Sequence, residues 1–381
     1  MRYCTQCVQP DTRPQIVFDE QGVCPACRYA ETLRYVDWQG RKQQLLDFCA
    51  PYRANHGEYD CLVGVSGGKD STRQALYVRD VLKMNPLLVS MTYPPQQQTE
   101  RGAHNLANLA EQGFDVLSAG ASPQIWKKLV RKGFFEHGNW ARSTELALFS
   151  YVPRMALAYQ IPLIFWGENP MLTLGEVSNT GRNDGGIVSS TLGGNTLGGG
   201  DIRWMLDEHI QPEHLIQYQY PEPEELEQAG LRFVYLGYYW KTWSKGFNAS
   251  FSGSRGLEVR SQHPLEIGDE LGVDALDDDW VALNQMLKYY KFGFGKVTDN
   301  VNEGIRQGEL TRDEAFDLVR RYDGRCSDAI IDSFCDYIEC STAAFWQVVE
   351  RYVNQKLFKK CGERQWQPLF YPHQAAGDGA L

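Results

Sequence analysis

The chain has 381 residues and a formal net charge of −10, and its sequence pI is near 5.3. This length predicts two or three structural units. The acidic balance argues against a protein whose main partner is nucleic acid, because such binding releases counterions from clustered lysine and arginine. The sequence has no long uninterrupted apolar run and no signal-peptide core, so it predicts a soluble, cytoplasmic protein.

Four of the ten cysteines form two Cys-x₂-Cys pairs near the N-terminus, namely Cys4, Cys7, Cys24 and Cys27. This spacing is typical of two zinc knuckles that share one tetrahedral Zn²⁺, and the alternative is four unconnected buried cysteines. Because all four ligands come from the protein, such a zinc would be structural. The other cysteines show no pairing pattern and are interpreted as core thiols.

Residues 30–50 have the apolar spacing of a helix, which Pro51 ends. From residue 60 onward, apolar strands alternate with amphipathic helices. The expected strands are 60–65, 87–93, 114–117 and 161–166, and the expected helices are 71–83, 100–112, 122–132 and 143–160. This alternation predicts an α/β fold with a doubly wound parallel sheet. Ligands bind such a sheet at the carboxyl ends of its strands, so the turns at Ser66–Ser71, Tyr93–Pro95 and Gly167–Pro170 should line one crevice.

The most informative of these turns is Ser66-Gly67-Gly68-Lys69-Asp70-Ser71, which follows a strand and opens a helix. Backbone N–H groups in such a turn can hold phosphate, and the alternative is a plain glycine turn. A Walker A loop does not fit, because Val63 and Asp70 stand where glycine and a hydroxyl residue are needed.

An ATP site built on this turn gives each residue a role. Backbone N–H groups and hydroxyls would hold the pyrophosphate part of ATP, Lys69 would add a positive charge, and Asp70 would bind Mg²⁺. Glu168 could bind a metal, a substrate hydroxyl or the nucleophile, or it could be a solvated or helix-capping carboxylate. The expected ATP-binding residues are Ser66, Gly67, Gly68, Lys69, Asp70, Ser71, Tyr93, Lys291 and Lys296. The expected catalytic residues are Lys69, Asp70 and Glu168, and the expected substrate contacts are Glu168 and Asn169.

The second half of the chain begins with the Gly-rich segment 175–200, which we interpret as a loop that covers the substrate. Residues 204–260 are rich in aromatic side chains, which we assign mostly to the core, although stacking on a sugar or base is an alternative. Helices are expected at 278–290, 299–307, 312–322, 327–339 and 342–360, followed by a disordered tail at 374–381. Lys291 and Lys296 flank a Gly-aromatic turn that would suit a second phosphate contact or be a simple interhelical turn.

These features predict three units: a zinc module with its linking helix at 1–55, a nucleotide-binding domain at 56–275, and a C-terminal helical region at 276–381. The turn at Ser66–Ser71 resembles the signature of the PP-loop (N-type) ATP pyrophosphatases. With the two knuckles, Trp166–Pro170 and Tyr290–Gly295, the chain resembles the N-acetyl sugar amidotransferases of bacterial surface-polysaccharide (lipopolysaccharide O-antigen) pathways. The resemblance spans most of the chain.

The resemblance implies that ATP adenylates the acetamido carbonyl of a sugar, taken here as UDP-linked, and that ammonia replaces the oxygen to give an acetamidino sugar. It also implies Mg²⁺, Zn²⁺, and partner subunits similar to a glutaminase and its cyclase that deliver ammonia. The sequence supports the external source of ammonia. No cysteine in the chain lies in a glutaminase elbow, so ammonia should come from solution or from a separate subunit. A PP-loop tRNA thiolase and a non-catalytic nucleotide-binding regulator are the alternatives. The identity of the sugar, the oligomeric state and the ammonia route are left open.

Overall fold

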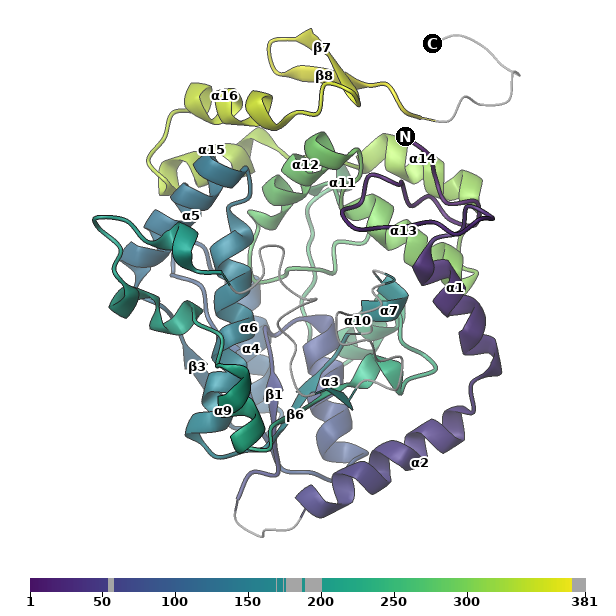
Figure 1. Ribbon diagram of the computed structural model, residues 1–381, viewed down its shortest axis with the longest axis vertical. Helices are drawn as coiled ribbons and strands as arrows, with labels where there is room; N and C mark the ends of the chain where they lie inside the picture. Colours follow the sequence, from purple (N-terminus) through teal and green to yellow (C-terminus); the bar gives the residue numbers. More distant parts are fainter. Residues whose placement is uncertain (54–57, 169, 174, 176–186, 189–200, 372–381) are drawn as a thin grey trace.

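The computed structural model describes residues 1–371 apart from 54–57, 169, 174, 176–186 and 189–200 (Figure 1). Its central element is a six-stranded sheet of order β3-β2-β1-β4-β6-β5. Five strands are parallel, and the short edge strand β5 pairs antiparallel with β6. The strands are β1 Cys61–Gly64, β2 Pro86–Met91, β3 Val116–Ala119, β4 Leu163–Trp166, β5 Ile187–Val188 and β6 Arg232–Tyr235. The predicted doubly wound parallel sheet is therefore confirmed.

Each face of the sheet packs into its own hydrophobic core, because strand side chains alternate between the faces. In β1, Leu62 enters one core, while Cys61 and Val63 enter the other. The first core includes residues of α5 and α6, and the second includes residues of α3 and α4. These helices span Lys69–Asp80 (α3), Glu100–Glu111 (α4), Pro123–His137 (α5) and Ala141–Ala158 (α6).

The ligand-binding edge of the sheet follows from its strand order. The chain moves outward from β1 through β2 to β3, and then crosses to β4 on the other side of β1. The segments that follow β1 and β4 therefore leave neighbouring parallel strands in opposite directions, which opens a crevice between them. Two of the three predicted turns, at 66–71 and after Trp166, begin at this switch point, whereas Tyr93–Pro95 follows β2.

The N-terminal segment contains two helices, α1 Pro25–Thr32 and α2 Trp38–Cys49, where we predicted one helix over residues 30–50. A 3₁₀ turn at Leu33–Tyr35 interrupts the helix. The side chain of Asp37 then accepts a hydrogen bond from the backbone N–H of Gly40 and starts α2 afresh. Asp37 is thus an N-cap that the apolar periodicity did not reveal.

The segment from 201 to 275 is built of short elements. They are the 3₁₀ helices Arg203–Met205, Pro212–Tyr218 and Leu236–Tyr238, the helices α9 Pro223–Gln228, α10 Lys245–Gly253 and α11 Pro264–Ile267, and strand β6. Most of the aromatic side chains here belong to the core, as predicted, and Tyr218, Trp240 and Trp243 are buried. The predicted covering loop at 175–200 lies almost entirely outside the described residues.

The C-terminal region is helical as predicted, with α12 Val281–Phe292, α13 Lys296–Gln307, α14 Arg312–Tyr322, α15 Asp328–Tyr337 and α16 Thr342–Tyr352. The prediction of a helix through residue 360 is wrong. α16 ends at Tyr352, and a hairpin of β7 Phe358–Gly362 and β8 Gln365–Pro368 follows. Its aromatic residues pack on the helices, with Phe358 buried beside the ring of Tyr290. The expected disordered tail lies outside the described residues.

The N-terminal segment lies against α13 and α14, far from it in sequence (Figure 1). The backbone N–H of Val8 donates to Asn302 of α13 at 2.9 Å, and Val8 shares a small core with both helices. Within the described residues, no helix combines the length and the apolar character that crossing a membrane requires.

Candidate active site

The turn after β1 has the geometry of an anion-binding loop. Gly67 has φ +77°, and a Cβ atom there would lie 2.8 Å from the backbone nitrogen of Leu106, so both the conformation and the packing require glycine. Helix α3 begins at Lys69 with Gly68 as its N-cap. The free N–H groups of its first turn therefore open toward the crevice, where they favour negative charge.

Three lysines from distant parts of the chain converge on one carboxylate beside this loop. Lys69 of α3, Lys245 of α10 and Lys296 of α13 all form ion pairs with Asp274, and the Lys245 Nζ lies 3.1 Å from its Oδ2. Burial alone would lower the pKa of Lys69, but Asp274 and Asp70 raise it overall. Among the described residues, ion pairs join these three lysines to two carboxylates, Asp274 and Asp70. A polyphosphate would therefore find more lysines than carboxylates near the helix N-terminus.

Asp70 stands next to this lysine cluster and is held from two sides. Its Oδ2 accepts from Lys69 Nζ at 2.8 Å, and its Oδ1 accepts from Asn248 Nδ2 at 2.6 Å. Asn248 is fully buried and is fixed in turn by Arg73. Because its amide is anchored, Asn248 holds the Asp70 carboxylate in one orientation. A carboxylate beside a phosphate-binding loop suits Mg²⁺, whose ligands are oxygens.

Glu168 follows β4 and lines the same pocket as Asp70 and Lys69. Its side chain is open to the solvent of the pocket, yet the surrounding protein removes part of its hydration. This desolvation, with repulsion from Asp70, raises the pKa of Glu168 to about 7. Near neutral pH the group therefore exchanges protons readily, as a general acid or base must.

The pocket encloses about 230 Å³ and has a polar and an apolar side. The polar side is the loop with Lys69, Asp70 and Asp274. The apolar side includes Met91, Leu148, Phe149, Val152 and Trp166. One side can therefore hold phosphates, while the other offers a surface for a flat ring such as a nucleobase.

The structure gathers most, but not all, of the predicted site residues at this pocket. Its lining includes Ser66, Gly68, Lys69, Asp70, Ser71 and Glu168. Lys296 reaches it through Asp274. Tyr93 does not line it and instead packs edge-on against Trp126. Lys291 also lies elsewhere, because its amine donates to the backbone oxygen of His137. Asn169 lies outside the described residues.

Three residues that complete the site were not predicted, namely Lys245, Asn248 and Asp274. Lys245 and Asn248 share the short helix α10, whose N-cap Ser244 accepts from the backbone N–H of Phe247. The serine N-cap and the residues after it could have predicted this helix. No sequence feature indicated Asp274, because it lies in an acidic stretch that is typical of a solvated turn.

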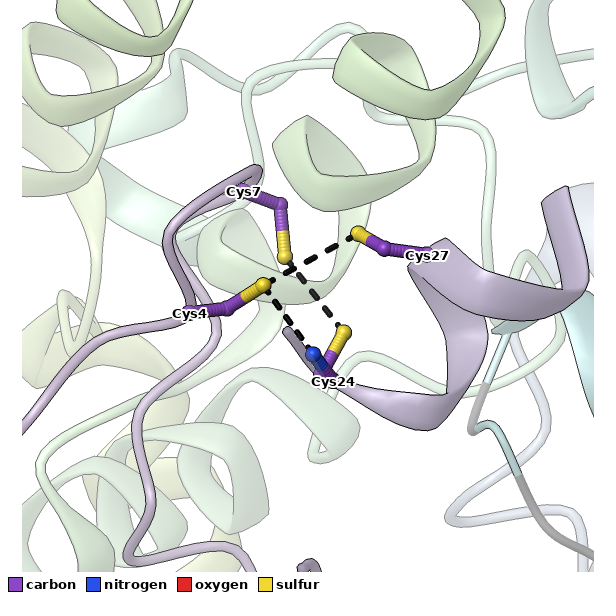
Figure 2. A group of neighbouring side chains, drawn as sticks. All are labelled: Cys4, Cys7, Cys24 and Cys27. Carbon is purple, nitrogen blue, oxygen red and sulfur yellow. Dashed lines mark hydrogen bonds between the residues drawn. The ribbon is translucent and has the colours of Figure 1, made fainter. Parts of the chain in front are cut away.

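The four N-terminal cysteines form a second candidate site (Figure 2). All four sulfurs lie within 4.8 Å of one another, with 4.0 Å between Cys4 and Cys27 and 3.7 Å between Cys7 and Cys24. Tetrahedral Zn–S bonds of about 2.3 Å imply sulfur separations of about 3.8 Å. The buried cluster thus fits one metal ion of the size and preference of Zn²⁺, as the spacing predicted.

Two arginines join this cysteine cluster to the rest of the protein. Arg312 of α14 donates to the backbone oxygens of Cys4 and Cys7. Arg306 of α13 lies 3.9 Å from the sulfur of Cys7, and it donates to the backbone oxygen of Leu172 at 2.9 Å. Lys296 is the first residue of α13, so the four-cysteine cluster contacts the helix that provides one lysine of the lysine cluster.

The role of Lys296 can be tested by Lys296→Met, which keeps the bulk of the side chain and removes its charge. We expect the affinity for a non-hydrolysable ATP analogue to fall about 10-fold, the loss of one charge-assisted hydrogen bond. Titration calorimetry measures this, with exposed Lys359→Met on β7 as the control. Equal affinities in Lys296→Met and the parent protein would place the phosphates elsewhere.

Residues 273–370 match a family model described as "LPS biosynthesis protein WbpG-like, C-terminal domain". The predicted resemblance to a lipopolysaccharide-biosynthesis family is confirmed over this segment. The segment includes Asp274 and Lys296, so the matched domain contributes directly to the pocket described above. No curated protein matches the chain.

Two solved structures resemble the chain weakly. One is the NH₃-dependent NAD synthetase from Campylobacter jejuni in complex with the nitrate ion, with 14% identity, TM-score 0.29, and coverage of 58% of this chain and 87% of that one. The other is NMN synthetase from Francisella tularensis, with 13% identity, TM-score 0.29, and coverage of 59% and 89%. At these values neither similarity bears on the function of this chain.

Proposed function

We propose that the protein is an ATP-dependent amidotransferase that converts the acetamido group of a nucleotide-linked N-acetyl sugar into an acetamidino group for lipopolysaccharide synthesis. The observation that carries the proposal is the convergence of Lys69, Lys245 and Lys296 near the N-terminus of α3, in the pocket that Glu168 also lines. The lysines suit a departing pyrophosphate, and Glu168 offers a proton acceptor in the same pocket. The family match over residues 273–370 supports the pathway.

In the first step, the amide oxygen of the sugar attacks the α-phosphorus of ATP, and pyrophosphate leaves. The loop N–H groups and the three lysines would stabilise the charge that develops on the leaving group. Asp70 would hold Mg²⁺, which neutralises further phosphate charge when bound. The apolar wall of Phe149 and Trp166 would orient the nucleoside and exclude water.

In the second step, the nitrogen of ammonia attacks the imidate carbon, and AMP leaves with the oxygen. The attacking nitrogen becomes more acidic as the C–N bond forms, and Glu168 would accept its proton. The product keeps two nitrogens on one carbon, which is the amidine. A tRNA thiolase would instead need a sulfur-carrying cysteine in the pocket, and none of the described lining residues is a cysteine.

The test of this function is amidine formation. Purified protein with ATP, Mg²⁺, ammonium chloride and a UDP-linked N-acetyl sugar should release AMP and pyrophosphate in equal amounts and form the acetamidino sugar, seen by mass spectrometry. Pyrophosphate release without a sugar product would favour a different acceptor, and binding of ATP without turnover would favour a regulator.

The nitrogen source gives a separate prediction. The isolated chain should use ammonium but not glutamine, because nothing in it resembles a glutaminase elbow. We propose that a separate glutaminase and a cyclase-like subunit supply ammonia. Adding them should restore turnover with glutamine. Glutamine-dependent turnover by the isolated chain, free of contaminating glutaminase, would contradict this division of labour.

The pH profile tests the role of Glu168. Because its pKa is raised to about 7, the carboxylate that accepts a proton is depleted below pH 7 and complete above it. The share of free NH₃ also rises with pH. At low ammonium concentration the logarithm of the rate should therefore climb with a slope of about 2 below pH 7 and about 1 above it. In Glu168→Gln the steeper limb should disappear, and an unchanged profile would remove Glu168 from the proton transfer.

A further inference from the structure

A second group of basic side chains lies outside the ATP pocket, at the junction of three helices. His137 is the last residue of α5, Arg142 lies in the first turn of α6, and Lys291 lies in the last turn of α12. Lys291 Nζ donates to the backbone oxygen of His137, and the His137 ring meets the edge of Trp204 with centroids 4.9 Å apart. The guanidinium carbon of Arg142 is 5.3 Å from the Trp204 ring. We call His137, Arg142 and Lys291 the basic cluster.

The basic cluster differs from the lysine cluster of the ATP pocket in its counterions. Among the described residues, no ion pair joins any of its three side chains to a carboxylate, whereas Lys69, Lys245 and Lys296 share Asp274. Two acids influence its members electrostatically: Glu136, which is exposed, acts on His137, and Asp201, which is paired with Arg203, interacts with Arg142.

Burial and mutual repulsion disfavour the charged forms of two members of the basic cluster. Burial and the nearby Arg142 lower the pKa of Lys291 to about 8, and burial with the same arginine lowers the pKa of His137. The Nε of Arg142 and the Nε2 of His137 are buried without a hydrogen-bond partner. Part of this arrangement caps the C-terminus of α5, since Lys291 binds one of its last carbonyl oxygens. The cap does not use Arg142, so the basic cluster contains more than the helix end needs.

The position of the basic cluster relates it to the ATP pocket. Arg142 and Phe149 are seven residues apart in α6, which places them on the same face of the helix, about 10 Å apart. Phe149 lines the ATP pocket. The short connection from α12 to α13 also links the two places, because Lys291 precedes it and Lys296 follows it. Lys291 on one side of this turn belongs to the basic cluster, and Lys296 on its other side belongs to the lysine cluster of the ATP pocket.

We propose that the basic cluster binds the diphosphate of the nucleotide-linked substrate, with Trp204 packing against its base or sugar. This inference rests on the proposed function for the identity of the ligand. Arginine and lysine are suited to phosphate oxygens, and an indole ring offers a flat stacking surface. A diphosphate held two helical turns from Phe149 leaves the length of a sugar between it and the ATP pocket. The acetamido group could then reach the α-phosphate of ATP.

The experiment uses UDP as the probe and the full chain, with its ATP site filled by Mg²⁺ and a non-hydrolysable ATP analogue. Calorimetry should show UDP binding to the filled protein. Arg142→Gln and Lys291→Met should each weaken UDP at least about 10-fold and leave the affinity for the ATP analogue within twofold. Lys132→Met is the matched control, because Lys132 belongs to the same helix as His137 but is paired with Asp207. Arg142→Lys should recover part of the loss, which a folding defect would not.

Two outcomes of the binding experiment would overturn the inference. UDP displaced by the ATP analogue would show that it had occupied the ATP pocket, and unchanged UDP affinity in both variants would exclude the basic cluster. The result is separable from the proposed function. If UDP binding is lost in the variants but the parent protein forms no amidine, the diphosphate site stands and the reaction is wrong. If Arg142→Gln forms amidine with an unchanged KM for the sugar, the reaction stands and the site is wrong.

Discussion

Asp70→Asn is expected to reduce pyrophosphate release from ATP at least about 100-fold, the usual effect of removing a main electrostatic element from a transition state. The substitution keeps the size of the side chain, and the hydrogen bond from Asn248 Nδ2 to its Oδ1 can persist. What it removes is the negative charge that would hold Mg²⁺ beside the three lysines. The loss should therefore appear in kcat more than in the affinity for ATP.

The matched control for this variant is Asp80→Asn at the other end of α3. Asp80 is exposed and paired with Arg79 at the surface, so its loss should change neither turnover nor thermal unfolding. Asp70→Asn should also unfold at the parent temperature, because the residue lies at the rim of the pocket. Pyrophosphate release within a few-fold of the parent rate would mean that this loop does not bind the reacting ATP.

Asn248→Ala separates positioning from chemistry at the same carboxylate. Asn248 does not itself line the pocket but hydrogen-bonds to Asp70, which does, so its removal should weaken Mg²⁺ binding before it abolishes turnover. We expect a higher Mg²⁺ requirement and a kcat that recovers partly at high Mg²⁺. An unchanged Mg²⁺ requirement would mean that Lys69 alone is sufficient to position Asp70.

The parts of the fold that could be predicted are those whose determinants are local. The strand β1 alternates between two cores, and the capping box of Thr311 and Glu314 starts α14 at the expected residue. Where local signals compete, prediction failed. Val353 follows α16 in an extended conformation, although its neighbours continue a helical spacing, because the hairpin after it packs on α12.

The candidate site divides in the same way. The residues of the loop after β1 were predictable, since one turn must contain both the glycine and the charges. Lys245 and Asp274 were not, because they reach Lys69 only through tertiary packing, from positions about 180 and 200 residues away in sequence. Lys291, in contrast, was predicted as a phosphate contact but does not line the pocket. It lies five residues before Lys296, yet Gly293 in a left-handed conformation ends α12 between them and separates their directions.

Loss of the zinc that we propose for the four-cysteine cluster is the second large expected effect. Cys24→Ser should abolish the single bound zinc, measured by elemental analysis, and lower the temperature of thermal unfolding. Metal binding by such clusters supplies on the order of 10 kcal/mol of folding free energy in small peptides, so the N-terminal module should lose its structure. The two main cores contain none of the four cysteines and should stay folded.

The consequence for activity follows from Arg306 and Arg312, which tie the cysteine cluster to α13 and α14. Without the metal, the cysteine cluster no longer fixes these two arginines. The position of α13 is then less well defined, and so is the position of Lys296 beside the ATP pocket. Cys24→Ser should therefore weaken binding of the ATP analogue in addition to lowering stability, whereas Cys361→Ser, exposed on the C-terminal hairpin, should do neither. Full zinc content in Cys24→Ser would show that the cluster is not the metal site. Zinc loss with unchanged ATP affinity would show that α13 keeps Lys296 in place without the module.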